Sequence, residues 1–243
     1  MRISLHSYKG GTGKTNITGN LGKYLAKKKH KVCIIDTDLN GSGLHSLFNL
    51  KFNNSLIELL QNECDASEII YKPEDDLDLY IIPTRVWEED LTSFFKTPSE
   101  AREKLNQLIE FVKREYGIEH ILFDCSPGIN KSSMLIMNLV DNAIIVSTID
   151  RQDIRGTYLL TNIAKKLGAN VHLLFNKIPP DKPEKITELI LEFSKKLNTD
   201  LLGSIEFDTK VAETWSRRLV IDSNLDCGYC NQIRAIASDL GLD

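Results

Sequence analysis

The chain has 243 residues, which is enough for one large α/β domain with a sizeable core. Its 30 basic and 34 acidic side chains give a net charge of −4, which argues against a dedicated nucleic-acid-binding protein but leaves room for a local basic patch. No linker, repeat or low-complexity tract divides the sequence, so we expect residues 1–243 to form a single domain.

Short apolar segments alternate with longer helical patterns along the chain. The predicted strands are 3–6, 32–35, 77–82, 120–123, 143–146, 171–175 and a weaker one near 201–205. The predicted helices are 14–29, 99–116, about 131–140, 153–167, 183–197 and one near 229–240. Ser99 is the predicted N-cap of the second helix, and Gly117 is its predicted C-terminal stop. Apolar strands separated by helices favour a doubly wound α/β fold, in which helices cover both faces of a single, mostly parallel sheet.

The sequence also suggests a cellular location. No signal peptide precedes the first apolar segment, and no apolar run is long enough to span a bilayer. We therefore expect a cytoplasmic protein without a membrane anchor. In that compartment its five cysteines are expected to be thiols or metal ligands rather than disulfides.

A glycine-rich loop follows the first predicted strand and opens the first helix. Its sequence is Lys9-Gly10-Gly11-Thr12-Gly13-Lys14-Thr15. Glycines allow the backbone to turn its N–H groups inward, and the positive end of the next helix points at the same place. Lys14 adds a charge for the β- and γ-phosphates of a nucleotide, and the Thr15 hydroxyl can bind Mg²⁺. This P-loop pattern predicts a binding site for a nucleotide and Mg²⁺.

The lysine that opens this loop resembles the signature lysine of the deviant Walker A motif in the ParA/MinD family of ATPases. That family uses a nucleotide-sandwiched dimer, in which the early lysine reaches the phosphates bound by the partner subunit. The resemblance implies this role for Lys9, as an extra cation supplied to the developing γ-phosphate charge. The alternative interpretation of Lys9 is a solvated loop lysine.

Two carboxylates close the second predicted strand in the segment Asp36-Thr37-Asp38. The segment resembles the Asp-x-Asp stretch of switch I in the same family, which implies that Asp38 positions or activates the attacking water. Asp36 would then support the Mg²⁺ shell or the loop geometry. The alternative is a pair of aspartates that cap a turn before a helix.

A third carboxylate, Asp124, ends the fourth predicted strand, as in a Walker B motif that holds Mg²⁺ directly or through water. The alternative for Asp124 is a cap of the next helix. Cys125-Ser126-Pro127-Gly128 follows Asp124, where the family more often shows Asp-Thr-Pro-Pro-Gly or Asp-Ser-Pro-Pro-Gly.

The segment Asn176-Lys177-Ile178-Pro179 ends the sixth predicted strand. GTPases place an aspartate where Pro179 stands, so the segment favours adenine over guanine. The resemblance implies that Asn176 contacts the adenine edge and that the segment near Glu206-Phe207-Asp208 packs around the base.

These interpretations give three residue sets. The catalytic set is Lys9, Lys14 and Asp38. The nucleotide-binding set is Gly10, Gly11, Thr12, Gly13, Lys14, Thr15, Asn16 and Asn176. The metal set is Thr15, Asp36 and Asp124.

A Cys-x-x-Cys pair, Cys227 and Cys230, lies close to the final helix. One pair cannot complete a four-ligand metal site, although two pairs across a dimer could. The iron–sulfur carrier branch of the superfamily has a comparable bridging pair at an earlier position. The alternative is two unlinked thiols.

Two segments are candidate binding surfaces, one for DNA and one for a membrane. Lys210, Arg217 and Arg218 resemble in placement the basic residues that ParA-like ATPases use against DNA, and three charges would give weak, non-specific, salt-sensitive binding. The final helix carries Ile233, Ile236 and Leu240 at helical spacing with one basic residue, a pattern that favours core packing over membrane binding.

The family resemblance therefore implies a slow, partner-stimulated ATPase that forms an ATP-dependent homodimer and positions DNA or another cargo with an activating partner protein. The alternatives are a metal-centre or iron–sulfur maturation ATPase that uses Cys227 and Cys230, and a ligase or amidotransferase-type enzyme related to dethiobiotin synthesis. A lysine that acts across a dimer argues against the last alternative.

Overall fold

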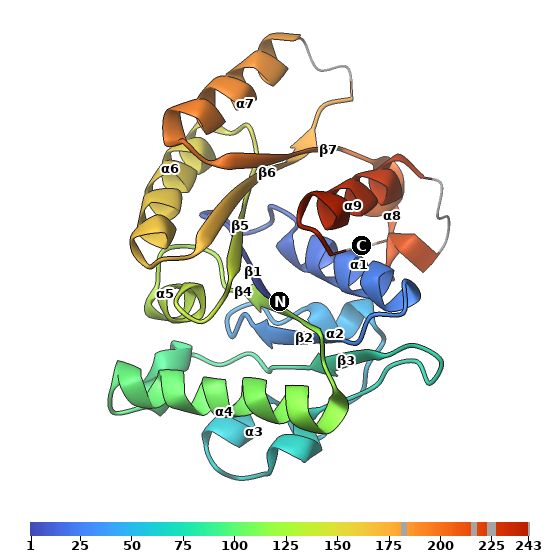
Figure 1. The fold of residues 1–243 in the computed structure, drawn as a ribbon, viewed down its shortest axis with the longest axis vertical. Coiled ribbons are helices and arrows are strands. Elements are labelled where there is room, and N and C mark those ends of the chain that lie inside the picture. Colours follow the sequence, from blue (N-terminus) through green and yellow to red (C-terminus); the bar gives the residue numbers. More distant parts are fainter. Residues whose placement is uncertain (181–183, 215–217, 223–226, 243) are drawn as a thin grey trace.

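The computed structural model describes residues 1–180, 184–214, 218–222 and 227–242. Its seven strands form one sheet in the order β3-β2-β4-β1-β5-β6-β7, and every neighbouring pair in that sheet is parallel (Figure 1). This arrangement confirms the predicted doubly wound α/β fold. The strands are β1 Arg2–His6, β2 Val32–Thr37, β3 Leu79–Ile82, β4 His120–Cys125, β5 Asn142–Ser147, β6 Asn170–Ile178 and β7 Asp200–Glu206.

Helices cover both faces of the sheet because successive strand side chains point to opposite sides. Leu122 of β4 packs in the cluster that contains α1 and α9, whereas Ile121 and Phe123 pack in the cluster formed with α3, α4 and α5. A third cluster joins α6 and α7 to β5 and β6. The helices are α1 Lys14–Lys27, α2 Leu44–Leu47, α3 Leu56–Leu60, α4 Pro98–Tyr116, α5 Lys131–Met137, α6 Arg151–Lys166, α7 Glu184–Leu197, α8 Thr209–Glu213 and α9 Gly228–Asp239.

The expected N-cap of the long helix α4 is wrong. Thr97, not Ser99, caps this helix: its side chain accepts a hydrogen bond from the N–H of Glu100, and Pro98 occupies the first turn. Proline is well suited to that position because the first helical N–H groups have no intrahelical acceptor. The predicted stop at Gly117 is confirmed, since this residue has a φ of 68° and donates its N–H to Lys113.

Other predicted boundaries differ by a few residues. α1 ends at Lys27 rather than at 29. The backbone torsions of Lys28 are no longer helical, and Lys29 has a φ of 73°. α5 ends at Met137 rather than near 140, and β3 begins at Leu79 rather than at 77. The one-turn helices α2 and α3 and three short 3₁₀ segments, at Ala66–Ile69, Leu91–Phe94 and Val220–Asp222, are too short to give a helical period in the sequence.

The strand order brings the polar strand ends together. β1 lies between β4 and β5, and the chain leaves it through the glycine-rich loop into α1. On one side, Asp36 of β2 is in register with Asp124 of β4. On the other side, Asn176 lies near the end of β6. The carboxyl edge of the sheet therefore gathers the residues that the sequence singles out. In the part of the chain that the structure describes, no helix is both long and apolar enough to cross a membrane.

Candidate functional site

A cavity of about 540 Å³ opens at the carboxyl edge of the sheet. Most of the predicted nucleotide-binding residues line it. They are Gly10, Gly11, Gly13, Lys14, Thr15, Asn16 and Asn176, and the predicted catalytic residue Asp38 joins them. Thr12 is buried beside them. The structure therefore brings the glycine-rich loop, switch segment and β6 end around one space.

The backbone of the loop has the shape that its glycines permit. Gly11 and Gly13 have φ values of 75° and 98°, a region that residues with a Cβ rarely adopt. A Cβ on Gly13 would also lie only 2.4 Å from the Nδ2 atom of Asn176. Glycine at position 13 is thus required by both torsion and close approach.

Two consecutive residues of β6 donate hydrogen bonds to backbone carbonyls of the glycine-rich loop. Asn176 donates its Nδ2 to the carbonyl of Thr12 at 2.7 Å, and Lys177 donates its Nζ to the carbonyl of Gly11 at 2.7 Å. The family resemblance implies that Asn176 contacts the adenine edge; in the structure Asn176 lines the cavity and also contacts the glycine-rich loop. Lys177 was not predicted as a site residue, although its position directly after Asn176 could have indicated it.

The two loop lysines face different surroundings. Lys14 is buried, and its Nζ donates to the Ser7 hydroxyl at 3.0 Å. Lys9 is partly exposed, and its Nζ lies 2.9 Å from the carboxylate of Asp150. Lys14 therefore belongs to the interior of the loop, whereas Lys9 lies on its outer side and is not solely a solvated lysine.

The two strand-end carboxylates, Asp36 and Asp124, are almost completely buried. Burial raises the pKa of Asp124 to about 6; Lys14 and hydrogen bonds from Thr15 and Thr18 oppose the rise, and Asp38 adds to it. Burial, followed by the charge on Asp124, also raises the pKa of Asp36 well above its usual range. Two acidic groups are thus held close together on neighbouring strands at the carboxyl edge of the sheet.

This carboxylate pair fits a divalent cation. The Oδ2 atoms of Asp36 and Asp124 are buried, and neither has a hydrogen-bond partner among the described residues. An unpaired buried oxygen costs free energy, and Mg²⁺ takes oxygen ligands, so a cation would offset both the missing partner and the repulsion. Thr15 contacts Asp124 and lines the cavity, which completes the predicted metal set.

Asp38 lies just beyond the end of β2 with its side chain toward the cavity. Its Oδ1 accepts the N–H of Gly41 at 3.1 Å, while its own N–H donates to Asp36. The aspartates therefore do shape a turn, as the alternative interpretation held, and Asp38 also lines the cavity. Asp124 does not cap the next helix, because Asn130 accepts the Ser133 N–H at the start of α5.

Residues from the end of β7 and from α8 also line the cavity. Glu206, Phe207 and Asp208, expected near the base, form part of its wall together with Val211 and Ala212 of α8. Tyr229, at the start of α9, also lines the cavity and was not predicted. A planar base could lie against this wall while the phosphates occupy the loop.

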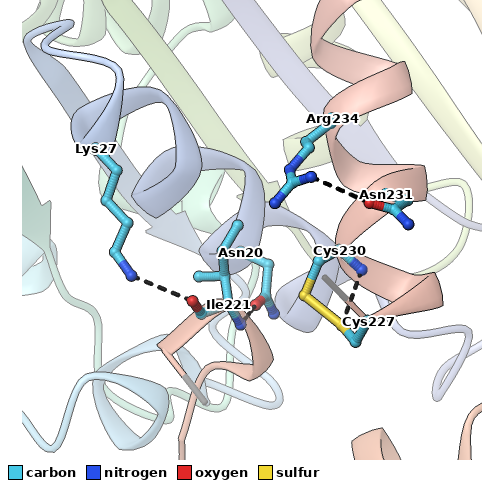
Figure 2. Close-up of a disulfide and its surroundings, with 7 residues drawn as sticks. All are labelled: Asn20, Lys27, Ile221, Cys227, Cys230, Asn231 and Arg234. Atoms are coloured by element: carbon cyan, nitrogen blue, oxygen red, sulfur yellow. Dashed lines mark hydrogen bonds between the residues drawn. A yellow bond between two sulfur atoms is a disulfide. The ribbon is translucent and has the colours of Figure 1, made fainter. Parts of the chain in front are cut away.

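The expectation that all cysteines are thiols or metal ligands is wrong for one pair. Cys227 and Cys230 form a disulfide in the first turn of α9, with their Cα atoms 5.2 Å apart (Figure 2). Helical geometry at this spacing brings the two sulfurs within bonding reach. Both residues are buried, so in this state they offer no thiolates to a metal or a cluster shared with another subunit.

The predicted DNA-binding residues can be placed only in part. Arg217 and the side chain of Lys210 lie outside the described residues, and Arg218 is exposed. The final helix agrees with its prediction: Ile233, Ile236 and Leu240 are buried in the cluster that contains α1.

Comparison with known proteins matches this arrangement to a family. A family model described as an AAA domain matches residues 1–175. The flagellum site-determining protein YlxH of Helicobacter pylori is 30% identical over 209 residues, which cover 84% of this chain and 69% of that protein.

Solved structures share the fold over nearly the whole chain. The septum site-determining protein MinD of Pyrococcus horikoshii, complexed with Mg-ADP, superposes with a TM-score of 0.81 at 24% identity and covers 98% of this chain and 95% of its own. A chain of the MinC:MinD cell division protein complex of Aquifex aeolicus gives a TM-score of 0.81 at 22% identity. The match covers 100% of this chain and 96% of that chain.

Proposed function

The chain belongs to the ParA/MinD family of P-loop ATPases, and from this premise we propose that it is an ATP-dependent dimerisation switch that positions a cellular cargo together with a partner protein. Residues 1–243 act as a single P-loop ATPase domain. The observation that carries the proposal is the cavity lined by the glycine-rich loop, the buried Lys14 and Asp38, with the buried Asp124 in contact with Thr15 of that loop.

Different residues of the cavity bind the phosphates, the base and the metal ion of the nucleotide. N–H groups of residues 10–16 and Lys14 hold the phosphates, and the wall at Phe207 and Tyr229 holds the adenine base. Asn176 supports nucleotide binding indirectly, because its hydrogen bond to the Thr12 carbonyl fixes the glycine-rich loop. Thr15, Asp36 and Asp124 would hold Mg²⁺, which would supply positive charge opposite the β- and γ-phosphates.

Hydrolysis depends on two further side chains. Asp38 lines the cavity and orients the attacking water toward the γ-phosphate. Lys9 crosses to the phosphates of a second copy of the chain, where its charge stabilises the transition state. Because Lys9 is tied to Asp150 in the single chain, hydrolysis is slow until a dimer and then a partner protein assemble.

A partner and a cargo are supported by the functions of the relatives. YlxH and MinD are named as site-determining proteins, and the MinC:MinD complex is one between MinD and a second protein. A surface created by the ATP-bound dimer would serve the same purpose here, and loss of the γ-phosphate would dissolve it. Weak DNA binding through Arg218 and its neighbours is a secondary part of this proposal.

Nucleotide retention and phosphate release test the proposal together. Purified protein should bind a fluorescent ATP analogue in the presence of Mg²⁺ and release phosphate slowly from ATP. Lys14→Ala should weaken binding at least tenfold, whereas Lys28→Ala, at the far end of α1, should not change it. Wild-type protein that binds no adenine nucleotide with Mg²⁺ would refute the proposal.

A further inference from the structure

The first turn of α9 contains a disulfide in an unusual place. Cys227 is the N-cap of the helix, and its Sγ accepts the N–H of Cys230 at 3.1 Å (Figure 2). The bond joins positions three residues apart. A ring this short removes little conformational entropy from the unfolded chain and links no distant elements. Its main effect is therefore on the geometry of this one turn.

The residue enclosed by the disulfide faces the nucleotide cavity. Tyr229 lies between the two cysteines, lines the cavity and is only 4% exposed. Its hydroxyl is buried without a hydrogen-bond partner among the described residues. Burial also raises the pKa of this hydroxyl, so that it stays a neutral phenol that can donate a hydrogen bond. Because the hydroxyl itself is inaccessible, Tyr229 meets the cavity through its ring, against which a planar base can pack.

The rest of α9 is held independently of the disulfide. Ile233 and Ile236 are fully buried in the cluster that includes Leu21 and Leu25 of α1. Opening the disulfide would leave this packing in place and would release only the first turn. The turn that carries Tyr229 is thus the part of the cavity wall whose geometry depends on the bond.

We propose that Cys227 and Cys230 form a redox-active pair, opened and closed by exchange with dithiols, and that its state sets the affinity of the cavity for nucleotide through Tyr229. The inference rests on the proposed nucleotide-binding function of the same cavity. The disulfide form holds Tyr229 in the wall and binds nucleotide more tightly. The dithiol form lets the turn relax and binds nucleotide more weakly.

The exchange chemistry follows from the different positions of the two sulfurs. A thiolate of an external dithiol attacks the Sγ of Cys227, which is 9% exposed, rather than that of Cys230, which is fully buried. A mixed disulfide forms, and Cys230 leaves as a thiolate and takes up a proton. The second thiolate of the reductant then attacks its own sulfur in the mixed disulfide and releases Cys227. Two electrons and two protons pass to the protein, and the reductant leaves as a disulfide.

The location at the end of a helix favours Cys227 as the reactive sulfur. The positive end of α9 stabilises a thiolate at the N-cap, which makes Cys227 both a good leaving group and an accessible nucleophile for re-oxidation. Thermodynamic linkage then requires reciprocity: if the disulfide form binds nucleotide more tightly, bound nucleotide must make the disulfide harder to reduce by the same factor.

The test uses the wild-type chain in buffers of reduced and oxidised dithiothreitol. Free thiols are counted by alkylation after acid quenching, with and without Mg-ADP. Three thiols are expected under oxidising conditions, from Cys33, Cys64 and Cys125, and five under reducing conditions. We expect ADP to bind about tenfold more tightly to the oxidised form and to lower the reduction potential correspondingly by about 30 mV.

Variants separate the pair from general effects of the reagent. Tyr229→Ala removes the ring from the cavity wall and should abolish the difference in ADP affinity between the two redox states, whereas Tyr229→Phe keeps the ring and should retain the difference. Cys64→Ser removes a partly exposed cysteine outside the cavity and should leave that difference unchanged. Circular dichroism verifies that each variant is folded.

Two results would overturn the inference while leaving the proposed function intact. One is five free thiols in every redox buffer, and the other is equal ADP affinity in the two states. Failure of the oxidised and the reduced wild type alike to bind ADP would instead count against the nucleotide-binding function itself.

Discussion

The Nζ atom of Lys9 lies 2.9 Å from Oδ1 of Asp150, so the lysine that opens the phosphate loop is paired with the residue that caps α6. The same carboxylate accepts the N–H groups of Gln152 and Asp153. The hydrogen bond from Lys9 is the main cause that lowers the pKa of Asp150, which keeps the carboxylate charged. A lysine that must reach a second subunit has to leave this partner first.

Removing the charge of Asp150 should therefore favour the dimer. Asp150→Asn keeps a side chain that caps α6 well but breaks the ion pair with Lys9. Because an exposed ion pair stabilises only weakly, we expect dimers to form at a modestly lower ATP concentration. Sedimentation at a series of ATP concentrations measures this shift. Asp141→Asn, which breaks the Arg2–Asp141 pair at the other edge of the sheet, is the control. An unchanged or higher ATP requirement in Asp150→Asn would argue against a restraining role for the pair.

Alanine at two glycines with positive φ should have different consequences. Gly13→Ala adds a Cβ against Asn176, whereas Gly168→Ala adds one with no atom within 4 Å. Both should lose about 1–2 kcal/mol of stability from backbone strain. Only Gly13→Ala should also lose nucleotide affinity, by tenfold or more, because the loop must shift. Calorimetric titration with Mg-ADP distinguishes the two, and equal affinities would contradict the loop geometry.

Asp38 should be needed for hydrolysis more than for binding. In Asp38→Asn the side chain still lines the cavity, but its ability to orient and activate water is lost. We expect phosphate release to fall by about 10²–10⁴-fold, with ATP affinity changed less than tenfold. Single-turnover assays with radiolabelled ATP measure both quantities. A variant that hydrolyses ATP at the wild-type rate would assign the water to another residue.

Acid should destabilise the fold through His120, at the start of β4. Burial, followed by the positive amino terminus and His30, lowers the pKa of His120 to about 4 against the opposing effect of Glu119. Between pH 6.5 and 4 the unfolded chain therefore binds a proton that the folded chain does not, so stability rises with pH in this window. From pH 6.5 to 5 this group should remove about 1 kcal/mol of unfolding free energy, after allowance for its partial exposure.

Urea unfolding of wild type and His120→Gln checks this sign. The difference between the two proteins should be constant above pH 7 and should change in favour of the variant as the pH falls to 5. A difference that does not depend on pH would show that His120 titrates alike in both states.

Much of the fold could be predicted because its strands are buried on both faces. Segment 32–35 is a continuous apolar run, and segment 171–175 is apolar apart from His172. The polar residues that follow them, Asp36 and Asn176, lie at the carboxyl edge of the sheet. The loop before α1 could be predicted as well, because its backbone has positive φ at positions 11 and 13, and glycine adopts such torsions most easily. The position of Asp38 followed from its place just after a strand.

Contacts between distant segments were not predictable in the same way. Nothing local relates Lys9 to Asp150, or Lys177 to Gly11, because the fold alone brings them together. Tyr229 reaches the cavity only because α9 packs against α1. The disulfide was missed for a different reason: the expectation about cysteines came from cellular compartment rather than from the helical spacing of Cys227 and Cys230.

Molar mass in solution is the most direct test of the dimerisation switch. Light scattering of the wild type should give twice the monomer mass with Mg-ATP and the monomer mass with Mg-ADP. Lys9→Ala should stay at the monomer mass with Mg-ATP, even where equilibrium dialysis shows ATP bound. A wild-type mass that is the same with ATP, with ADP and without nucleotide would contradict the account.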